Sequence, residues 1–512
     1  MARFKSLAVL ATCLSFVHAK CRITTSGAPS SDIVLKGTVL TPDGPLRNGR
    51  ILVKDGKIAE VSTECVDNSD SVHSVAGRIL LRNGTTTELN ANCKTANPEL
   101  DSARSLVTVL ECTGSSVISP GFINTHEHIA FSTLNPFKDT GERYDHRHDW
   151  RLGLRNHTEL PAPVNGSVSD ATAWGELRHL LSGTTSLVGG YMVPGLARNL
   201  DFMAGLEGSG TDGPDATWDL FPLDDSTGIL RDGDCNYGPN AMDSEDAGKV
   251  FRYMAHVAEG VDAEAATEFK CLSSETYDTT PLARGGGVSS DIIAPNVVLI
   301  QALGLSEADF DLVAARRAKI VWSPRSNVSL YGKTLNVSYL LEAGIKVALG
   351  TDWLPSGSAT MGREAVCGRY VMEKSFGVEL DSATLWKMMT INAAEVVGFE
   401  QHLGSLDVGK AADIVIFGGD DKGDPFAQAI YAASEDIELV MRGGKVMLAA
   451  DDLKTAASGA CELLHIGDSR KTICIRDELG MSFAAFEASL QGVYPAVYPR
   501  VPEDEPSCEP TR

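Results

Sequence analysis

The sequence predicts an α/β protein in which a parallel (β/α)8 barrel carries a smaller β domain built from both ends of the chain. Two observations favour the barrel: short apolar runs alternate with helical patterns between about residues 116 and 403, and several of these runs end in polar residues. A third observation, β-rich stretches on both sides of this region, predicts the smaller domain. An open doubly wound sheet is the alternative, but no glycine-rich phosphate loop follows the first strand.

The first 19 residues predict a secretory signal peptide. They combine the basic residues Arg3 and Lys5, an apolar run from Leu7 to Val17 and small residues suited to cleavage after Ala19. A membrane anchor is the alternative, but this run is short for a span, and no later segment has the apolar run that a spanning helix needs. We therefore expect a secreted protein without a membrane partner.

Residues 20–115 predict the N-terminal part of the β domain. The turn signals Pro-Asp-Gly, Arg-Asn-Gly and Lys-Asp-Gly separate β-rich runs between residues 32 and 61, which is typical of antiparallel hairpins. A polar, cysteine-bearing insertion follows. A second β-rich piece, 404–450, predicts the C-terminal part of the same domain. The tail, 451–512, predicts a short helix within 481–493 and a proline-rich extended end.

The middle of the chain, 116–403, predicts the barrel. Continuous apolar runs predict buried strands within 184–190, 250–260, 296–304, 318–324 and 345–352. Apolar residues at helical spacing predict helices within 170–183, 306–317, 337–344 and 382–398.

Cysteines and sequons agree with an exported protein. Removal of the signal peptide leaves ten of the 11 cysteines, an even number that suits disulfides in an oxidising compartment. Their pairing stays open, and Cys271 and Cys367 are equally well interpreted as buried free thiols. Five Asn-x-Ser/Thr sequons predict a glycoprotein on a eukaryotic secretory route, at Asn83, Asn156, Asn165, Asn327 and Asn336.

Composition excludes several classes of partner. The hydrophobic content of 43% over 512 residues is enough for one large core and a satellite domain. The formal net charge of −23 disfavours nucleic acid and anionic membranes as partners. We therefore expect a small-molecule substrate, and assembly into a homo-oligomer is compatible with the sequence.

Histidines and one aspartate stand at the ends of predicted strands. His126 and His128 end the first barrel strand, where alternate side chains share a face and lie about 7 Å apart. His256 and Asp352 end two later strands. The C-terminal ends of barrel strands form one face, so these side chains are expected to meet there. Three imidazoles and a carboxylate suit one divalent ion, zinc first, with iron and manganese as alternatives.

The motifs around these residues resemble the metal-dependent amidohydrolase superfamily, in particular its cytosine deaminase, chlorohydrolase and adenosylhomocysteine deaminase-like branch. They read PGFINTHEH, HVAEG, ALGTDW and LGSLDVGKAADIVIF, and the resemblance extends over about residues 32–447. It implies a distorted (β/α)8 TIM barrel with a β-sandwich built from both chain ends. It also implies hydrolysis of a C–N bond in a cyclic amide, an amidine or an aminated ring.

The resemblance implies a role for each matching residue. His126, His128, His256 and Asp352 would ligate one metal ion, and Asp352 would also orient the nucleophile. Glu259 resembles the general acid/base of this branch, with capping of a following helix as the structural alternative. Family members with two metals use a lysine on the fourth strand, and the candidate stretch ATWDLFPL contains none.

Gln301 stands where the family usually has a histidine on the sixth strand. An amide donates or accepts a hydrogen bond but cannot carry a proton near neutral pH. This departure leaves two alternatives to the hydrolase: a vestigial or binding barrel with little activity, and a metal-assisted lyase or isomerase on the same fold.

Two further stretches predict substrate contacts at the barrel mouth. Arg325 and Asn327 follow the seventh strand in SPRSNVSLYG, and His146 and His148 follow the first strand in ERYDHRHDW. Charge that only stabilises the loops is the alternative for all four residues. A position at the mouth would also disfavour a glycan on Asn327.

Overall fold

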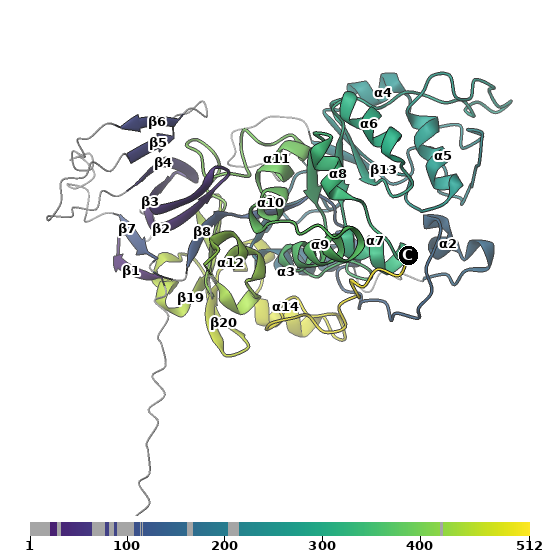
Figure 1. The fold of residues 1–512 in the computed structure, drawn as a ribbon. Coiled ribbons are helices and arrows are strands. Elements are labelled where there is room, and N and C mark those ends of the chain that lie inside the picture. Colours follow the sequence, from purple (N-terminus) through teal and green to yellow (C-terminus); the bar gives the residue numbers. More distant parts are fainter. Residues whose placement is uncertain are drawn as a thin grey trace, which may run out of the picture.

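The computed structural model describes residues 21–27, 32–63, 107–112, 114, 116–160, 167–202, 215–419 and 423–512, and the backbone of the strands β5 (Gly77–Leu80) and β6 (Thr86–Leu89). The expected signal peptide lies outside these residues, as do Cys65, Cys93 and the sequons at Asn83 and Asn165. Figure 1 shows a β domain beside a barrel surrounded by helices.

Eight parallel strands form the barrel in the described part of the chain. They are β9 (Phe122–Asn124), β10 (Thr184–Leu187), β11 (Arg198–Asn199), β12 (Ala216–Asp219), β13 (Arg252–Val257), β14 (Val297–Gln301), β15 (Lys319–Trp322) and β16 (Val347–Leu349). They pair as two sheets, β11-β10-β9 and β12-β13-β14-β15-β16. Backbone hydrogen bonds join the sheets, from Ala216 to Leu200 at one seam and from Asp352 to His126 at the other. The fold is thus a TIM-type barrel with irregular seams.

The barrel strands are buried on both faces, as their continuous apolar runs predict. Met254, Val298, Ile300 and Val321 pack in one cluster. Alternate residues of the same strands, such as Leu299, belong to a separate cluster that includes many residues of the surrounding helices. Both faces of these strands are therefore covered, except in β12, which is only partly buried.

Helices connect and cover the strands. They are α2 (Arg147–Leu152), α3 (Val168–Leu180), α4 (Ser244–Lys249), α5 (Ala263–Leu272), α6 (Glu307–Ala315), α7 (Pro324–Tyr331), α8 (Val337–Glu342), α9 (Met361–Phe376), α10 (Ser382–Met388), α11 (Ile391–Val397), α12 (Pro425–Tyr431), α13 (Arg476–Leu479) and α14 (Phe483–Ser489). Many begin at an Asp, Ser or Thr whose side chain accepts a backbone N–H of the first turn, such as Ser306 before α6. The single helix expected within 382–398 is two helices, because the backbone leaves helical geometry at Thr390.

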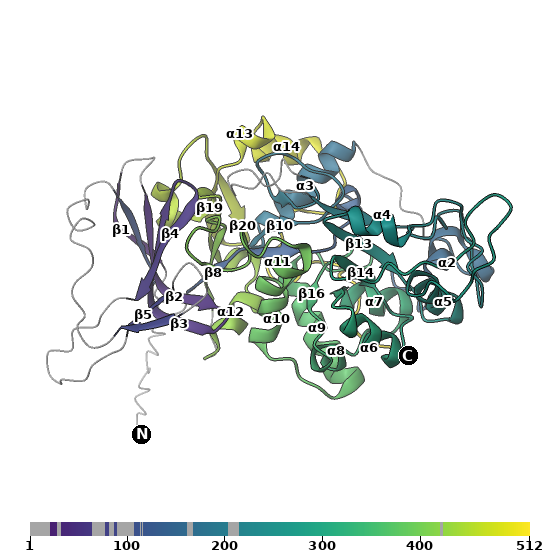
Figure 2. The ribbon, with the colours of Figure 1, turned by 90° about the horizontal axis from the view of Figure 1, so that it is seen from above.

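One large sheet unites both ends of the chain in the β domain. Its strands are β1 (Arg22–Thr25), β2 (Ile33–Thr41), β3 (Gly44–Lys54), β4 (Lys57–Thr63), β7 (Thr108–Glu111), β8 (Val117–Pro120), β17 (Ile414–Phe417), β18 (Ile437–Arg442), β19 (Lys445–Ala450), β20 (Glu462–Ile466) and β21 (Ser469–Ile473). β17 pairs antiparallel with β8, and Figures 1 and 2 show early and late strands side by side. Leu35 and Ile118 pack against Ile414 and Leu439 in the core of this domain.

The hairpins predicted from turn residues are confirmed. β2 pairs antiparallel with β3, and β3 with β4. Asp55 and Gly56, between β3 and β4, both have positive φ, as a tight two-residue hairpin turn requires. The hairpin of β20 and β21 was not expected, because residues 451–473 show little apolar alternation.

Four disulfides join described cysteines: Cys21–Cys112, Cys235–Cys271, Cys367–Cys508 and Cys461–Cys474. The alternative that Cys271 and Cys367 are free thiols is therefore wrong. Sequence could not decide this, since their partners lie 36 and 141 residues away. Within the described ranges, no helix is both long enough and apolar enough to span a bilayer.

Candidate metal centre

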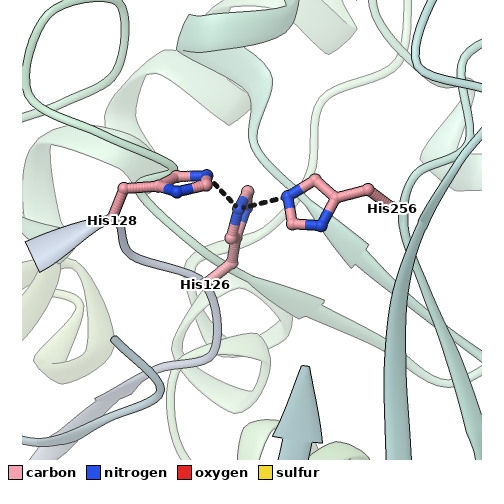
Figure 3. Close-up of side chains that lie close together, drawn as sticks. All are labelled: His126, His128 and His256. Atoms are coloured by element: carbon pink, nitrogen blue, oxygen red, sulfur yellow. Dashed lines mark hydrogen bonds between the residues drawn. The ribbon is translucent and has the colours of Figure 1, made fainter. Parts of the chain in front are cut away.

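Four side chains converge beyond the C-terminal ends of the barrel strands. His126 and His128 follow β9, His256 lies in β13, and Asp352 follows β16. Figure 3 shows the ring of His126 between those of His128 and His256, with their nitrogens facing one another. Nε2 of His126 lies 3.2 Å from Nε2 of His128 and 3.0 Å from Nε2 of His256. Oδ1 of Asp352 lies 3.4 Å and 3.2 Å from the Nε2 atoms of His126 and His128. The structure thus brings all four sequence-predicted ligands together.

The spacing of these atoms fits a divalent cation. In a tetrahedral zinc site, bonds of about 2.1 Å place neighbouring ligand atoms about 3.4 Å apart. The separations of Nε2 of His126 from His128, His256 and Asp352, and of His128 from Asp352, are 3.0–3.4 Å, and the three imidazole nitrogens all lie within 4.8 Å of one another. The donors are three imidazole nitrogens and one carboxylate oxygen. His126, His128 and His256 form a cluster that could hold a metal ion.

Contacts at the second ring nitrogen orient two of the imidazoles. Nδ1 of His256 lies 3.1 Å from the carbonyl oxygen of Asp219, to which it can donate only when protonated. That tautomer leaves a lone pair on Nε2, directed toward the other ligands. Nδ1 of His126 lies 3.3 Å from Oγ of Ser323.

Burial keeps these imidazoles in the form that binds metals. Desolvation, followed by the neighbouring histidines, lowers the pKa of His126 well below its ordinary value. Desolvation also lowers the pKa of His256 well below that value, with His128 and Arg147 contributing. Both rings are therefore neutral at physiological pH and can donate a lone pair.

The backbone at the site is tightly constrained. A Cβ at Gly350 would lie 2.6 Å from Cβ of His126, so only glycine allows the end of β16 to approach this ligand. Asp352 and Gln301 have positive φ values of 66° and 74°. Such conformations are costly for residues with a side chain, and they cluster at functional sites.

Glu259 follows β13 and is buried beside the ligands. Its Oε1 accepts a hydrogen bond of 2.7 Å from the hydroxyl of Tyr331. Desolvation, and next the carboxylate of Asp352, raise the pKa of Glu259 to about 7. The alternative that Glu259 caps α5 is wrong, because Asp262 occupies the N-cap and accepts the N–H of Ala265.

Gln301 is held by hydrogen bonds that fix the orientation of its amide. Its Nε2 donates to Oδ2 of Asp352 at 3.2 Å, and its Oε1 accepts from Nδ2 of Asn327. Oδ1 of Asn327 in turn accepts from Thr334, whose Oγ1 accepts from the indole of Trp322 at 2.6 Å. A row of hydrogen-bonded groups therefore leads from Trp322, which packs against the surrounding helices, to Asp352.

Asp352 is oriented from one side. Its Oδ2 also accepts a hydrogen bond of 2.5 Å from Ser326, which lies in α7 next to Asn327. With Gln301 and Ser326 on Oδ2, the other oxygen faces the histidines. Sequence reasoning missed Ser326 and Tyr331, although both lie in the stretch SPRSNVSLYG.

The remaining candidates have protein partners of their own. His146 lies 3.1 Å from Glu268, and His148 lies 2.8 Å from Asp225. Arg147, between them, contacts both carboxylates. These side chains are buried at the start of α2, not in the loop that was expected.

Arg325 is also engaged away from the metal ligands. Its Nε donates to Ser358 at 2.6 Å, its Nη2 lies 3.1 Å from Glu505, and its Nη1 donates to the carbonyl of Pro506. The hydrogen bonds and ion pairs of His146, His148 and Arg325 with other protein groups account for the burial of these side chains. That these three residues contact the substrate stays a prediction.

Aromatic rings surround the exposed side of His128. The ring of Trp218 lies 4.9 Å from it and that of Trp353 lies 6.3 Å away. Trp150 lies 5.2 Å from Trp353 and donates a hydrogen bond of 2.8 Å to the hydroxyl of Tyr331. Flat apolar surface thus adjoins the most accessible of the three imidazoles.

Part of the chain matches a known protein family. The protein-family model described as the amidohydrolase family matches residues 251–447. A 5-methylthioadenosine/S-adenosylhomocysteine deaminase of Halothermothrix orenii is 30% identical over 202 residues, which cover 36% of this chain and only 44% of that protein. A 5'-deoxyadenosine deaminase of Methanosarcina acetivorans is 25% identical over 416 residues, covering 75% of this chain and 84% of that protein.

Solved structures share the fold. Atrazine chlorohydrolase of Arthrobacter aurescens TC1, complexed with zinc, has a TM-score of 0.56 at 17% identity, over 90% of this chain and 100% of that one. An adenosine deaminase of Xanthomonas campestris with bound zinc has a TM-score of 0.52 at 16% identity, over 90% and 97%. The family match over residues 251–447 and the similar deaminases, together with the motifs and the converging ligands, support a member of the metal-dependent amidohydrolase superfamily.

Proposed function

We propose that this amidohydrolase uses one divalent metal ion to hydrolyse a C–N bond of a small molecule. The observation that carries the proposal is the convergence of three imidazole nitrogens and a carboxylate oxygen beside the buried carboxyl group of Glu259. Among the substrate classes, an aminated ring is favoured over a cyclic amide or an amidine. The support is the naming of similar proteins as deaminases of adenosine derivatives, together with the indole rings beside His128.

His126, His128, His256 and Asp352 would hold the ion. Zinc suits this donor set best, and it is bound in two structures of the same fold. When bound, the ion lowers the pKa of a water molecule to about 7, which supplies hydroxide near neutral pH. A single ion is proposed because β12, Ala216–Asp219, contains no lysine that could bridge two metal ions.

Glu259 handles the protons in this proposal. A carboxyl group with a pKa of about 7 can both accept and release a proton near neutral pH. It would take one proton from the attacking water and deliver it to the leaving nitrogen. The hydroxyl of Tyr331 keeps the carboxylate in position and favours its charged form.

Gln301 has a positioning role in the same proposal. Its amide donates to Asp352 and accepts from Asn327, so it fixes the carboxylate without carrying a proton. We therefore assign Gln301 and Asn327 to the orientation of Asp352, and we assign His146 and His148 to the support of the loops. The row of hydrogen bonds from Trp322 to Asp352 disfavours a vestigial site. A site that has lost its function would not require each of these polar groups to keep its hydrogen-bond partner.

Export through a secretory route is proposed as well. Four disulfides in the described residues suit an oxidising compartment. Asn156 is exposed at the end of a short 3-10 helix, Leu154–Asn156, and is the proposed glycan acceptor. The sequon at Asn327 is not proposed, because this side chain is buried and bonded to Gln301.

The function is tested with purified protein and a panel of aminated purines, pyrimidines and triazines, together with cyclic amides. Release of ammonia, or ring opening, is followed with the wild type and with Glu259→Gln. We expect the wild type to hydrolyse one class of the panel and Glu259→Gln to keep its metal while losing nearly all turnover. A metal-loaded wild type that hydrolyses none of these compounds would favour the binding barrel or the lyase and isomerase alternatives.

A further inference from the structure

We infer that residues 505–512, which we call the strap, position helix α7 and, through it, the catalytic side chains. The strap would then support the active site, and Glu505 would be its main positioning residue. It rests on the proposed function, because the side chains that α7 holds are those proposed to carry the reaction.

Helix α7 supports three members of the site within eight residues. Ser326 donates to Oδ2 of Asp352, and Tyr331 donates to Oε1 of Glu259 at 2.7 Å. Asn327 donates to the amide oxygen of Gln301. A displacement of this one helix would therefore misplace Asp352, Gln301 and Glu259 together.

The strap contacts both ends of α7. At the first turn, the guanidinium of Arg325 lies 3.1 Å from a carboxylate oxygen of Glu505 and donates to the carbonyl of Pro506. At the last turn, the carbonyl of Gly332, the C-cap residue, accepts the backbone N–H groups of Thr511 at 2.8 Å and Arg512 at 3.0 Å. Figure 1 shows the strap in yellow, ending beside α7.

The strap is fixed to α9 as well. Arg363 donates to both oxygens of Glu505, with the shortest contact at 2.6 Å. Further along the same helix, the disulfide Cys367–Cys508 joins it to the strap covalently. The strap thus ties α7 to a long helix that runs beside it.

Glu505 is the electrostatic centre of this contact. Its side chain is 6% exposed and lies between the guanidinium groups of Arg325 and Arg363. Loss of one partner from a buried ion pair leaves the other charge without compensation, which is more disruptive than loss of an exposed pair. Neutralising Glu505 should therefore release the first turn of α7 while most of the fold stays intact.

The first experiment compares Glu505→Gln with Glu503→Gln, an identical change of charge at an exposed neighbour. We expect kcat of Glu505→Gln to fall by about 10-fold or more, since errors of about 1 Å in a site can cost about 100-fold. KM and bound metal should match the wild type, and Glu503→Gln should retain full kcat. Equal kcat in the two variants, or a loss explained by KM alone, would overturn the inference.

Hydrogen–deuterium exchange gives a readout that needs no substrate. In Glu505→Gln, peptides that cover residues 324–332 should exchange faster than in Glu503→Gln, while peptides from α3 stay unchanged. If the wild type hydrolyses nothing, the proposed function fails, and this exchange still decides whether the strap holds α7. Unchanged exchange at 324–332 would refute the inference irrespective of activity.

The disulfide provides an independent perturbation. The double variant Cys367→Ser/Cys508→Ser removes the covalent link between the strap and α9, and Cys461→Ser/Cys474→Ser removes the disulfide that joins the two ends of the β20–β21 hairpin. We expect a lower kcat and faster exchange at 324–332 only in the first variant. The same kcat and exchange in both variants would argue against a positioning role.

Discussion

Replacing Tyr331 by phenylalanine removes a single hydroxyl group from the wall around Glu259. That hydroxyl donates a hydrogen bond of 2.7 Å to Oε1 of Glu259, and it accepts one of 2.8 Å from Trp150. The bond favours the charged carboxylate and so lowers a pKa that burial has raised to about 7. Its loss should therefore raise the pKa of Glu259 further.

The size of the shift follows from the strength of such bonds. A hydrogen bond to a charged group contributes about 1.5–3 kcal/mol, and one pKa unit corresponds to about 1.4 kcal/mol. Tyr331→Phe should then raise the pKa of Glu259 by about one to two units. A bound cation would lower this pKa in both proteins, so the difference between them should remain.

The assay is kcat/KM against pH for the wild type and Tyr331→Phe. Glu259 must be ionised to accept a proton, so activity should rise with pH through its pKa, and the acid limb of the variant should lie at higher pH. At pH values well below the acid limb, kcat/KM of Tyr331→Phe should be about 10- to 100-fold lower than that of the wild type. The two pH profiles should approach each other at alkaline pH. Tyr339→Phe, which loses an exposed hydroxyl contact to Asp311, is the matched control. An acid limb that does not move in Tyr331→Phe would refute the proton-transfer role of Glu259.

Two further changes test the support of the site. Gln301→His places one donor and one acceptor nitrogen on a rigid ring, where they diverge more than the nitrogen and oxygen of the amide and cannot contact Asp352 and Asn327 in the same way. The value of kcat should therefore fall by about 10-fold in steady-state assays, and faster hydrolysis would show that Gln301 limits the reaction. Asp225→Asn removes a charge partner of the buried Arg147 and should reduce the free energy of unfolding by about 3 kcal/mol in urea titrations. The exposed Asp232→Asn should leave that free energy within about 0.5 kcal/mol of wild type, and equal stability of the two variants would contradict the burial argument.

The barrel could be predicted because its strands are buried on both faces. A run such as Val297–Gln301 is apolar at nearly every position, which distinguishes it from the alternating strands of the β domain. The ligands could be found because the ends of parallel barrel strands meet at one face, so His256 and Asp352 had to approach His126.

The supporting contacts could not be predicted in the same way. His148 pairs with Asp225, 77 residues away, and a histidine beside an arginine looks the same whether it faces a substrate or a buried carboxylate. The strap contacts Arg325 across 181 residues from a segment without periodicity. Ser326 and Tyr331 could be recognised only from the structure, where α7 places their hydroxyl groups against Asp352 and Glu259.

Metal content is the most direct test of the central claim, that four separated side chains form one cation site. The purified wild type and His256→Ala are dialysed against zinc and analysed by mass spectrometry of the metal, with circular dichroism to verify folding. The site requires close to one equivalent in the wild type and almost none in the folded variant. A folded wild type that retains no transition metal, or a variant that retains a full equivalent, would contradict it.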